Sequence, residues 1–301
     1  MTKNSKTALK PFVKWAGGKG QLISKIRDTY PKGLGERYTR YAEPFVGGGA
    51  VFFDILNNFD LDALYISDIN KELICTYQSI KSSVNELICM LYDFQKDYVP
   101  ANEEARKQYY YAKRVQFNEK KTNGANASDL ECAALFVFLN KTCFNGLYRV
   151  NRKGEYNVPM GSYKNPLICD EKNLREISAK LQKVEIVCGD YRDSESFVDD
   201  KTFVYFDPPY RPLTETASFT AYTENLFGDN AQMELAEYVE KIGRVGAKVV
   251  VSNSDPKNSD VGDDFFDRLY SRLSIRRVEA TRMINCNGEA RGRVSELLIL
   301  N

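Results

Sequence analysis

The stretch Asp207-Pro208-Pro209-Tyr210 places an acid, two prolines and an aromatic side chain directly after the short apolar run 203–206. Proline fixes φ, lacks a backbone N–H donor and pushes the preceding residue toward extended geometry. The run predicts a strand, so the carboxylate of Asp207 would be held rigidly at the carboxyl end of that strand, where open α/β sheets bind ligands. A simple turn that ends the strand is the alternative interpretation.

A glycine loop, "EPFVGGG" at 43–49, follows a predicted strand at 41–45 and opens a predicted helix at 49–57. The next predicted strand ends at Asp68, 21 residues after Gly47. Glycine lets the backbone approach a nucleotide-like ligand, and an acid after the second strand can accept hydrogen bonds from ribose hydroxyls. Because the loop is shorter than G-x-G-x-x-G, it predicts a nucleoside-bearing cofactor without implying hydride transfer.

The segment "KWAGGK" at 14–19 precedes a predicted helix at 18–28. Glycines before a helix let backbone N–H groups face an anionic ligand, here with Lys19 nearby. The spacing is not that of a P-loop. A plain turn is therefore the alternative, and Trp15 on its own would be interpreted as a core residue.

The composition of the chain limits which catalytic groups it can use. The chain has no histidine, and its seven cysteines form no Cys-x-x-Cys pair. This excludes Ser-His and Cys-His nucleophilic catalysis, and we expect no metal site. Without a signal peptide or an apolar run of bilayer length, the sequence predicts a cytoplasmic protein with reduced thiols.

Charge is distributed unevenly along the chain. Residues 105–164 contain 11 Lys and Arg against 4 Asp and Glu, whereas the remainder contains 31 against 37. Such a basic segment indicates a site for a polyanion, although a solvated lysine-rich face would look the same.

Strand-like and helical runs alternate over most of the sequence, which predicts an α/β fold with a mostly parallel sheet. The stretch between 84 and 164 is the exception, because it predicts helices and an irregular loop. Ser128 or Asp129 could cap the predicted helix that begins directly after them. We expect a catalytic domain at 1–80 and 165–301, interrupted by a helical domain at 81–164 with a loop near 143–163. The seven predicted strands are 41–45, 63–67, 184–188, 203–206, 248–252, 275–281 and 294–300, and the other predicted helices include 69–81, 170–182 and 229–243.

The order of these motifs resembles that of amino-methyltransferases that use S-adenosylmethionine. The resemblance is closest to the Dam-like DNA adenine-N6 methyltransferases, in which a glycine loop (FxGxG) precedes a target-recognition insert and then DPPY. It covers nearly the whole chain, through "KWAGGK", "EPFVGGG", "DIN", "FNGLYRVNRKGEYNVP", "DPPYRPL", "FTAY" and "SNSD". It implies a Rossmann-like, seven-stranded methyltransferase sheet with an inserted, mainly helical target-recognition domain.

The resemblance also implies roles for individual residues. Asp190 and Tyr191 would contact the adenine of the cofactor, and Asp68 would hold its ribose. Cofactor contacts are implied for Trp15, Ala16, Gly17, Lys19, Pro44, Phe45, Gly47, Gly49, Asp68, Asp190, Tyr191 and Asp207.

The resemblance assigns Asp207, Pro208, Pro209 and Tyr210 to catalysis. Adenine N6 is a poor nucleophile because its lone pair is delocalised into the ring. A carboxylate (Asp207) and a fixed carbonyl (Pro208) that accept its two N–H bonds would favour a tetrahedral nitrogen and stabilise its developing charge. Tyr210 would stack on a base taken out of the duplex.

In the resembling family the loop at 143–163 recognises GATC. Arg149 would contact guanine, Leu147 and Pro159 would contact thymine, and Phe144 would intercalate beside the flipped base. A buried aromatic is the alternative for Phe144. Ser162 stands where some relatives have arginine, which puts one phosphate contact in doubt. DNA contacts are implied for Lys14, Phe144, Asn145, Leu147, Arg149, Asn151, Pro159 and Tyr163.

These observations predict a site-specific DNA methyltransferase that acts on adenine N6 in GATC. Alternatives are a related enzyme acting on cytosine N4, RNA or a protein amide, and a non-catalytic DNA-binding relative. Protein-amide enzymes tend to have Asn in place of Asp207, and cytosine-N4 enzymes tend to have Ser. We expect a monomer that binds double-stranded DNA and no membrane, and a cognate restriction endonuclease is a further candidate partner.

Overall fold

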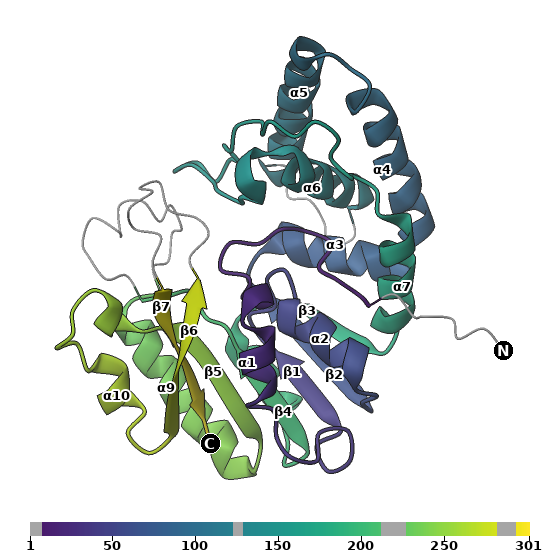
Figure 1. The fold of residues 1–301 in the computed structure, drawn as a ribbon. Coiled ribbons are helices and arrows are strands. Elements are labelled where there is room, and N and C mark those ends of the chain that lie inside the picture. The colour runs from purple at the N-terminus through teal and green to yellow at the C-terminus, as the bar shows by residue number, and fades with distance from the viewer. Residues whose placement is uncertain (1–7, 123–128, 212–226, 282–292) are drawn as a thin grey trace. The chain divides into compact units, whose positions relative to one another are not determined.

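The structure is a computed structural model that describes residues 8–122, 129–211, 227–281 and 293–301 (Figure 1). The motif "FTAY" at 219–222 lies outside these residues. None of the helices in the described part is both long and apolar enough to cross a membrane.

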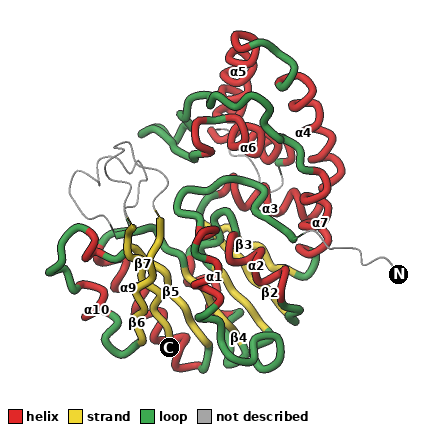
Figure 2. The backbone as a smooth tube through the Cα atoms, in the orientation of Figure 1, coloured by secondary structure: helices red, strands yellow, loops and turns green. Residues whose placement is uncertain are grey.

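Seven strands form one sheet in the order β3-β2-β1-β4-β5-β7-β6 (Figures 1 and 2). The pairs β1–β2, β1–β4 and β4–β5 are parallel, whereas β7 is antiparallel to both β5 and β6. The expected α/β fold with a mostly parallel, seven-stranded sheet is thereby confirmed. The strands are β1 (Arg40–Glu43), β2 (Ala63–Asp68), β3 (Val184–Cys188), β4 (Thr202–Phe206), β5 (Lys248–Ser254), β6 (Ser274–Thr281) and β7 (Arg293–Leu300).

The helices largely follow the predicted ranges. One difference is the expected helix 18–28, which is a 3-10 turn, η1 (Lys19–Gln21), followed by α1 (Ile23–Arg27). Glycines at 17, 18 and 20 disfavour a regular first turn. The other described α-helices are α2 (Ala50–Asn58), α3 (Lys71–Ser82), α4 (Val84–Tyr98), α5 (Glu103–Thr122), α6 (Leu130–Thr142), α7 (Glu171–Leu181), α9 (Asp229–Val245) and α10 (Phe265–Leu269).

The chain divides into two compact units. Unit 1 comprises 1–18, 47–58 and 68–188, and unit 2 comprises 19–46, 59–67 and 189–301. The expected separation of 81–164 as an inserted domain stays a prediction.

Unit 1 is built around α6. This helix is apolar on all sides and buried over most of its length, and it packs against α3, α4 and α5. A helix that is hydrophobic all round belongs in a core. Asp129 caps it, because the Asp129 side chain accepts the N–H of Cys132 at 3.0 Å. Of the two candidate caps, the structure therefore selects Asp129.

Unit 2 contains the strands that position the acidic motif. Since β1, β4 and β5 run parallel, their carboxyl ends share one edge of the sheet. Every residue of β4 is buried, and the chain leaves the core at Asp207. Helix α9 packs against β5. The apolar strand thus delivers a carboxylate to the edge at which parallel sheets bind ligands.

Candidate active site

The carboxylate of Asp207 lies in a network of hydrogen bonds within unit 2. Its Oδ1 atom accepts from Lys19 Nζ at 2.6 Å and from Ser252 Oγ at 2.9 Å. Lys19 Nζ also donates to the Tyr210 hydroxyl at 3.1 Å and lies 4.9 Å from the centre of the Tyr210 ring. Asp207 and Tyr210 of the predicted motif therefore share one cation, which fixes both side chains.

Lys19 carries its charge in an almost completely buried position, with 3% of the residue exposed. Burial alone would lower the pKa of this ammonium group, but the carboxylate of Asp207 and the oxygen of Tyr210 outweigh burial and raise the pKa above its usual value. Burial raises the pKa of Tyr210 to about 12. At neutral pH the cluster therefore contains an ammonium group and a neutral phenol.

Two hydrogen-bond acceptors of the Asp207–Tyr210 motif remain available to a ligand. Within the described part of the chain, neither Asp207 Oδ2 nor the Pro208 carbonyl accepts a hydrogen bond, whereas the Pro209 carbonyl accepts one from Gln232 at 3.1 Å. An exocyclic amine has two N–H donors, so one carboxylate oxygen and one carbonyl match its hydrogen-bonding capacity. The arrangement can hold an amine, which is the chemistry predicted from the sequence.

The glycines of the loop, 47–49, and Asp68 form a second cluster, which lies in unit 1. Asp68 accepts the N–H of Gly47 at 3.0 Å through Oδ2 and the N–H of Asn70 at 2.9 Å through Oδ1. Burial raises the pKa of Asp68, and these two backbone donors oppose that shift. Each carboxylate oxygen can accept a further hydrogen bond, so Asp68 can still hold a ribose hydroxyl.

Two glycines of the loop adopt backbone conformations that side chains disfavour. Gly47 has φ +46°, and an added Cβ would lie 2.7 Å from Trp15 Cδ1; at Gly49, with φ +72°, it would lie 2.5 Å from the Tyr77 hydroxyl. Trp15 itself stacks on Tyr148 with ring centres 5.9 Å apart. The structure thus brings Trp15, Gly47, Gly49 and Asp68 together, a cradle that fits the nucleoside of S-adenosylmethionine.

Gly47→Ala is expected to weaken cofactor binding by roughly tenfold or more, because the methyl group would displace the indole of Trp15 and an L side chain at positive φ costs about 1–2 kcal/mol. Isothermal titration with S-adenosylmethionine measures the change. Gly154→Ala is the control, since Gly154 has φ +75° but open space around its Cβ position. If both variants lost the same affinity for S-adenosylmethionine, the contact between position 47 and Trp15 would not be the cause of the loss.

The remaining predicted cofactor residues have varied surroundings. In unit 2, Phe45 stacks on the buried ring of Tyr191, with centres 5.5 Å apart. Asp190 caps the 3-10 turn η3 (Tyr191–Ser196) and forms an ion pair with Arg192 at 2.7 Å, so its carboxylate already has local partners. Pro44 is buried in unit 2, whereas Ala16 and Gly17 are exposed in unit 1.

The loop at 143–163 in unit 1 has a hairpin-like form. Antiparallel bridges join Cys143 to Met160 and Val150 to Tyr156. Phe144 is 52% exposed, which excludes the alternative of a buried aromatic. The next residue, Asn145, has φ +56°. A left-handed Asn after an exposed aromatic forms a turn that presents both side chains to solvent.

Arg149 is exposed at the edge of this loop, and Asn157 orients it by accepting from Arg149 Nε at 2.8 Å. Asn151 has a structural role, because its Oδ1 accepts the N–H groups of Lys153 at 2.9 Å and Glu155 at 3.0 Å. Leu147 is half-buried and Pro159 is exposed.

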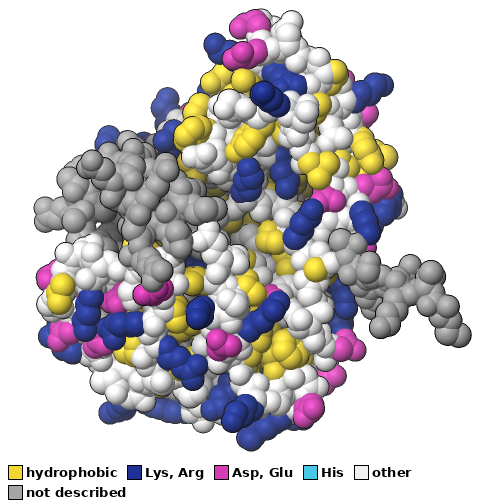
Figure 3. Space-filling model, viewed as in Figure 1, with side chains coloured by type: hydrophobic (Ala, Val, Ile, Leu, Met, Phe, Trp, Pro, Cys, Tyr) yellow, Lys and Arg dark blue, Asp and Glu magenta, His cyan; other side chains and the backbone are white. Residues whose placement is uncertain are grey.

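Lys14 and Tyr163 also meet in unit 1, with Lys14 Nζ 3.1 Å from the Tyr163 hydroxyl. Asn140, a buried residue of α6, accepts the Lys14 N–H and donates to the Lys14 and Gly146 carbonyls, at 2.8, 2.8 and 3.1 Å. One amide, that of Asn140, thus joins Lys14 to the loop at 143–163. On the helical part in Figure 3, Lys and Arg side chains lie among hydrophobic and some acidic ones.

Three residues that the sequence interpretation assigned no role support these clusters. Ser252 belongs to the quoted motif "SNSD", so its presence near Asp207 had a signal in the sequence. Asn140 interrupts the apolar run of α6, and a polar residue in such a run indicates a buried hydrogen-bonding role. Gln232 lies in an ordinary amphipathic helix and has no such signal.

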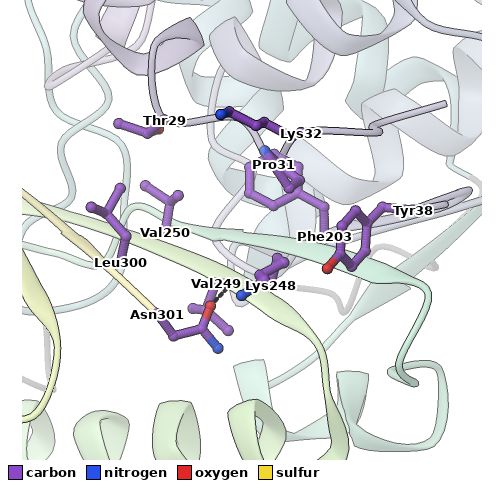
Figure 4. Close-up of a pocket in the computed structure, with 10 residues that line it drawn as sticks. All are labelled: Thr29, Pro31, Lys32, Tyr38, Phe203, Lys248, Val249, Val250, Leu300 and Asn301. Atoms are coloured by element: carbon purple, nitrogen blue, oxygen red, sulfur yellow. Dashed lines mark hydrogen bonds between the residues drawn. The ribbon is translucent and has the colours of Figure 1, made fainter. Parts of the chain in front are cut away.

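A cavity of about 260 Å³ lies at the opposite ends of the strands from Asp207 (Figure 4). Its walls include Tyr38, Phe203, Lys248 and Asn301. Because Phe203 and Lys248 lie at the amino ends of β4 and β5, this cavity is separate from the carboxyl-end site.

The chain matches the family described as D12 class N6 adenine-specific DNA methyltransferase over residues 15–284. It is 47% identical to the type II methyltransferase M.MjaIII of Methanocaldococcus jannaschii, over 97% of this chain and 99% of that protein. It is 36% identical to the DNA adenine methylase of Escherichia coli K12 and 35% identical to that of Haemophilus influenzae. These two alignments cover 96% and 97% of this chain and 94% and 93% of the respective relatives. The Dam-like resemblance is confirmed, and the chain belongs to the D12 class of N6 adenine-specific DNA methyltransferases.

Proposed function

We propose that this methyltransferase transfers a methyl group from S-adenosylmethionine to N6 of an adenine that is flipped out of duplex DNA at GATC. The observation that carries the proposal is the pair of available acceptors, Asp207 Oδ2 and the Pro208 carbonyl, beside a carboxylate oxygen already held by Lys19 and Ser252. Flipping is required because adenine N6 is otherwise occupied in base pairing.

Trp15, the glycine loop and Asp68 would hold S-adenosylmethionine, which supplies an electrophilic sulfonium methyl group when bound. Asp207 and the Pro208 carbonyl would each accept one N–H bond from the target amine. As the nitrogen forms its bond to carbon and becomes positive, both hydrogen bonds strengthen, so they stabilise the transition state more than the ground state. The neutral phenol of Tyr210 would stack on the base, with its orientation fixed by Lys19.

For sequence recognition, Arg149 would contact guanine, with its guanidinium oriented by Asn157. Leu147 and Pro159 would contact the thymine methyl group, and the exposed ring of Phe144 would fill space beside the flipped base. Asn145, Lys14 and Tyr163 would complete the contacts. Asn151 is proposed to act through the turn that it stabilises.

A labelling experiment tests the proposal. The protein is incubated with methyl-labelled S-adenosylmethionine and duplexes containing GATC or a one-base variant, and the modified nucleoside and its position are identified. N6-methyladenine found only at GATC supports the proposal. Labelled N6-methyladenine in another sequence would overturn the recognition site. Label in cytosine, RNA or protein, or DNA binding without transfer, would favour the alternatives.

Arg149→Ala is expected to reduce discrimination at the contacted guanine by roughly 1–3 kcal/mol, about 5- to 150-fold, since a bidentate contact to guanine contributes this much. The ratio of kcat/KM for GATC to that for a duplex with the guanine replaced measures the effect. Arg152→Ala, an exposed arginine of the same loop, should lower both values alike. An unchanged ratio in Arg149→Ala would assign guanine recognition to another residue.

A further inference from the structure

Two buried side-chain amides, linked by a hydrogen bond, hold the backbone of the proline segment after Asp207. Gln232 of α9 is fully buried, and its Nε2 donates to the Pro209 carbonyl at 3.1 Å. Its Oε1 accepts from Asn253 Nδ2 at 3.1 Å, and Asn253 is 1% exposed. Asn253 Oδ1 in turn accepts the N–H of Ser254 at 2.9 Å. All four residues belong to unit 2.

The orientation of both amides follows from their end partners. A carbonyl can only accept, so Gln232 must present its NH₂ group to Pro209; a backbone N–H can only donate, so Asn253 must present its oxygen to Ser254. The two inner atoms are then a donor and an acceptor that face each other. Reversing either amide would place two acceptors or two donors together, so the chain has one consistent arrangement.

The hydrogen bond from Gln232 restrains a segment whose two successive prolines have no backbone N–H groups. Neither Pro208 nor Pro209 has an N–H group, so a neighbouring acceptor cannot fix the segment. Asp207 is fixed on one side by Lys19 and Ser252. The ring of each proline sets φ, which leaves the ψ angles to determine where the Pro208 carbonyl points. A hydrogen bond to the Pro209 carbonyl restricts that freedom from the other side.

We propose that Gln232 is a positioning residue for methyl transfer, which aims the Pro208 carbonyl at the target amine by holding the Pro209 carbonyl, with Asn253 orienting Gln232. This inference rests on the proposed role of the Pro208 carbonyl. Gln232 touches no reacting atom, so its effect appears in kcat and not in affinity for cofactor or DNA. A displacement of about 1 Å at a reacting group can cost about 100-fold in rate, which gives the scale of the effect.

The test compares Gln232→Glu with Gln232→Met. Glu has nearly the same shape as Gln. An ionised Glu would place an acceptor against the Pro209 carbonyl, whereas a protonated Glu can donate a hydrogen bond to that carbonyl. We expect kcat of Gln232→Glu at pH 8 to fall roughly 10- to 100-fold, with unchanged cofactor Kd and DNA KM within threefold of wild type. As pH falls, the ratio of its kcat to that of wild type should rise. Gln232→Met should stay slow at every pH.

Controls separate positioning from folding. Asn301→Asp is the control variant, because the exposed Asn301 also donates through Nδ2 to a backbone carbonyl, that of Ala247 at 2.8 Å, next to the amino end of β5. It should keep kcat within threefold of wild type. Rates are normalised to the folded fraction from circular dichroism. The ratio of each variant's kcat to that of wild type cancels the effect of groups that titrate in both proteins, such as Tyr210.

The outcomes are distinct. A wild-type kcat for Gln232→Met, or a Glu variant that stays as slow as the Met variant at low pH, overturns the positioning role while wild-type transfer continues. Changes confined to cofactor Kd or DNA KM also overturn it. If wild type itself does not methylate adenine, the proposed function fails, and the positioning role falls with it.

Discussion

Asp207→Ala is expected to lower kcat for methyl transfer on the order of 10³-fold, because it removes a preorganised acceptor from the nitrogen that becomes positive. Binding of DNA and cofactor should change by less than threefold, since Asp207 makes one contact among many. Single-turnover transfer under saturating conditions, with DNA affinity from fluorescence anisotropy, measures both quantities. The large loss in rate reflects a hydrogen bond that strengthens only as the reaction proceeds.

Asp199→Ala provides the control for loss of a carboxylate. Asp199 is a half-buried residue of the same unit, ion-paired with Arg40 at 3.4 Å, and its removal should leave the rate within twofold of wild type. Loss of DNA binding in Asp207→Ala as large as the loss of turnover would contradict the assigned role. Retention of more than a tenth of the wild-type rate would do so as well.

Local pattern was sufficient to predict the sheet. Strand β4 is an apolar run ended by two prolines, and strand β2 is ended by Asp68 and followed by the Asn70 cap of α3, so both boundaries are encoded by neighbouring residues. The glycine loop was equally visible, because positive φ at Gly47 and Gly49 demands glycine whatever the surroundings. These signals act over a few residues, which is why the elements and the motif positions could be predicted.

Pairings between distant residues could not be predicted in this way. Lys19 and Asp207 are 188 positions apart, and nothing near Lys19 indicates that its ammonium group binds the Asp207 carboxylate. The family resemblance implied a cofactor role for Lys19, which stays a prediction beside the observed ion pair. Asn151 has polar chemistry suited to DNA, but the structure uses its oxygen to close a turn. In both cases the sequence showed which chemical group the side chain carries, whereas the residue that it binds depended on the fold.

The ion pair between Lys19 and Asp207 has unequal burial, with 3% of one side chain exposed and 21% of the other. Removing Asp207 would leave a buried ammonium group that keeps its hydrogen bond to the Tyr210 hydroxyl but loses this ion pair, which costs about 3 kcal/mol. Removing Lys19 would leave a carboxylate that still accepts from Ser252 and reaches solvent, so the cost should be nearer 1 kcal/mol. Stability and catalysis can therefore be separated at this site.

The double variant Lys19→Met/Asp207→Ala is expected to be more stable than Asp207→Ala alone by about 2 kcal/mol at pH 7, yet equally inactive. Without the carboxylate of Asp207, the largest influence on the folded-state pKa of Lys19 is burial, which lowers it, whereas Tyr210 and Glu296 oppose this shift less strongly. We therefore expect the folded-state pKa of Lys19 in Asp207→Ala to lie below its unfolded value. The unfolded state then binds more protons, so the stability of Asp207→Ala rises with pH and its gap to the double variant narrows between pH 7 and pH 10. In wild type the pKa of Lys19 is raised, so this group stays protonated in both states below about pH 10 and contributes a constant stability there. Urea unfolding at a series of pH values measures the gap. A double variant that is less stable than Asp207→Ala, or a gap that widens with pH, would show that Lys19 does not depend on Asp207 for its charge.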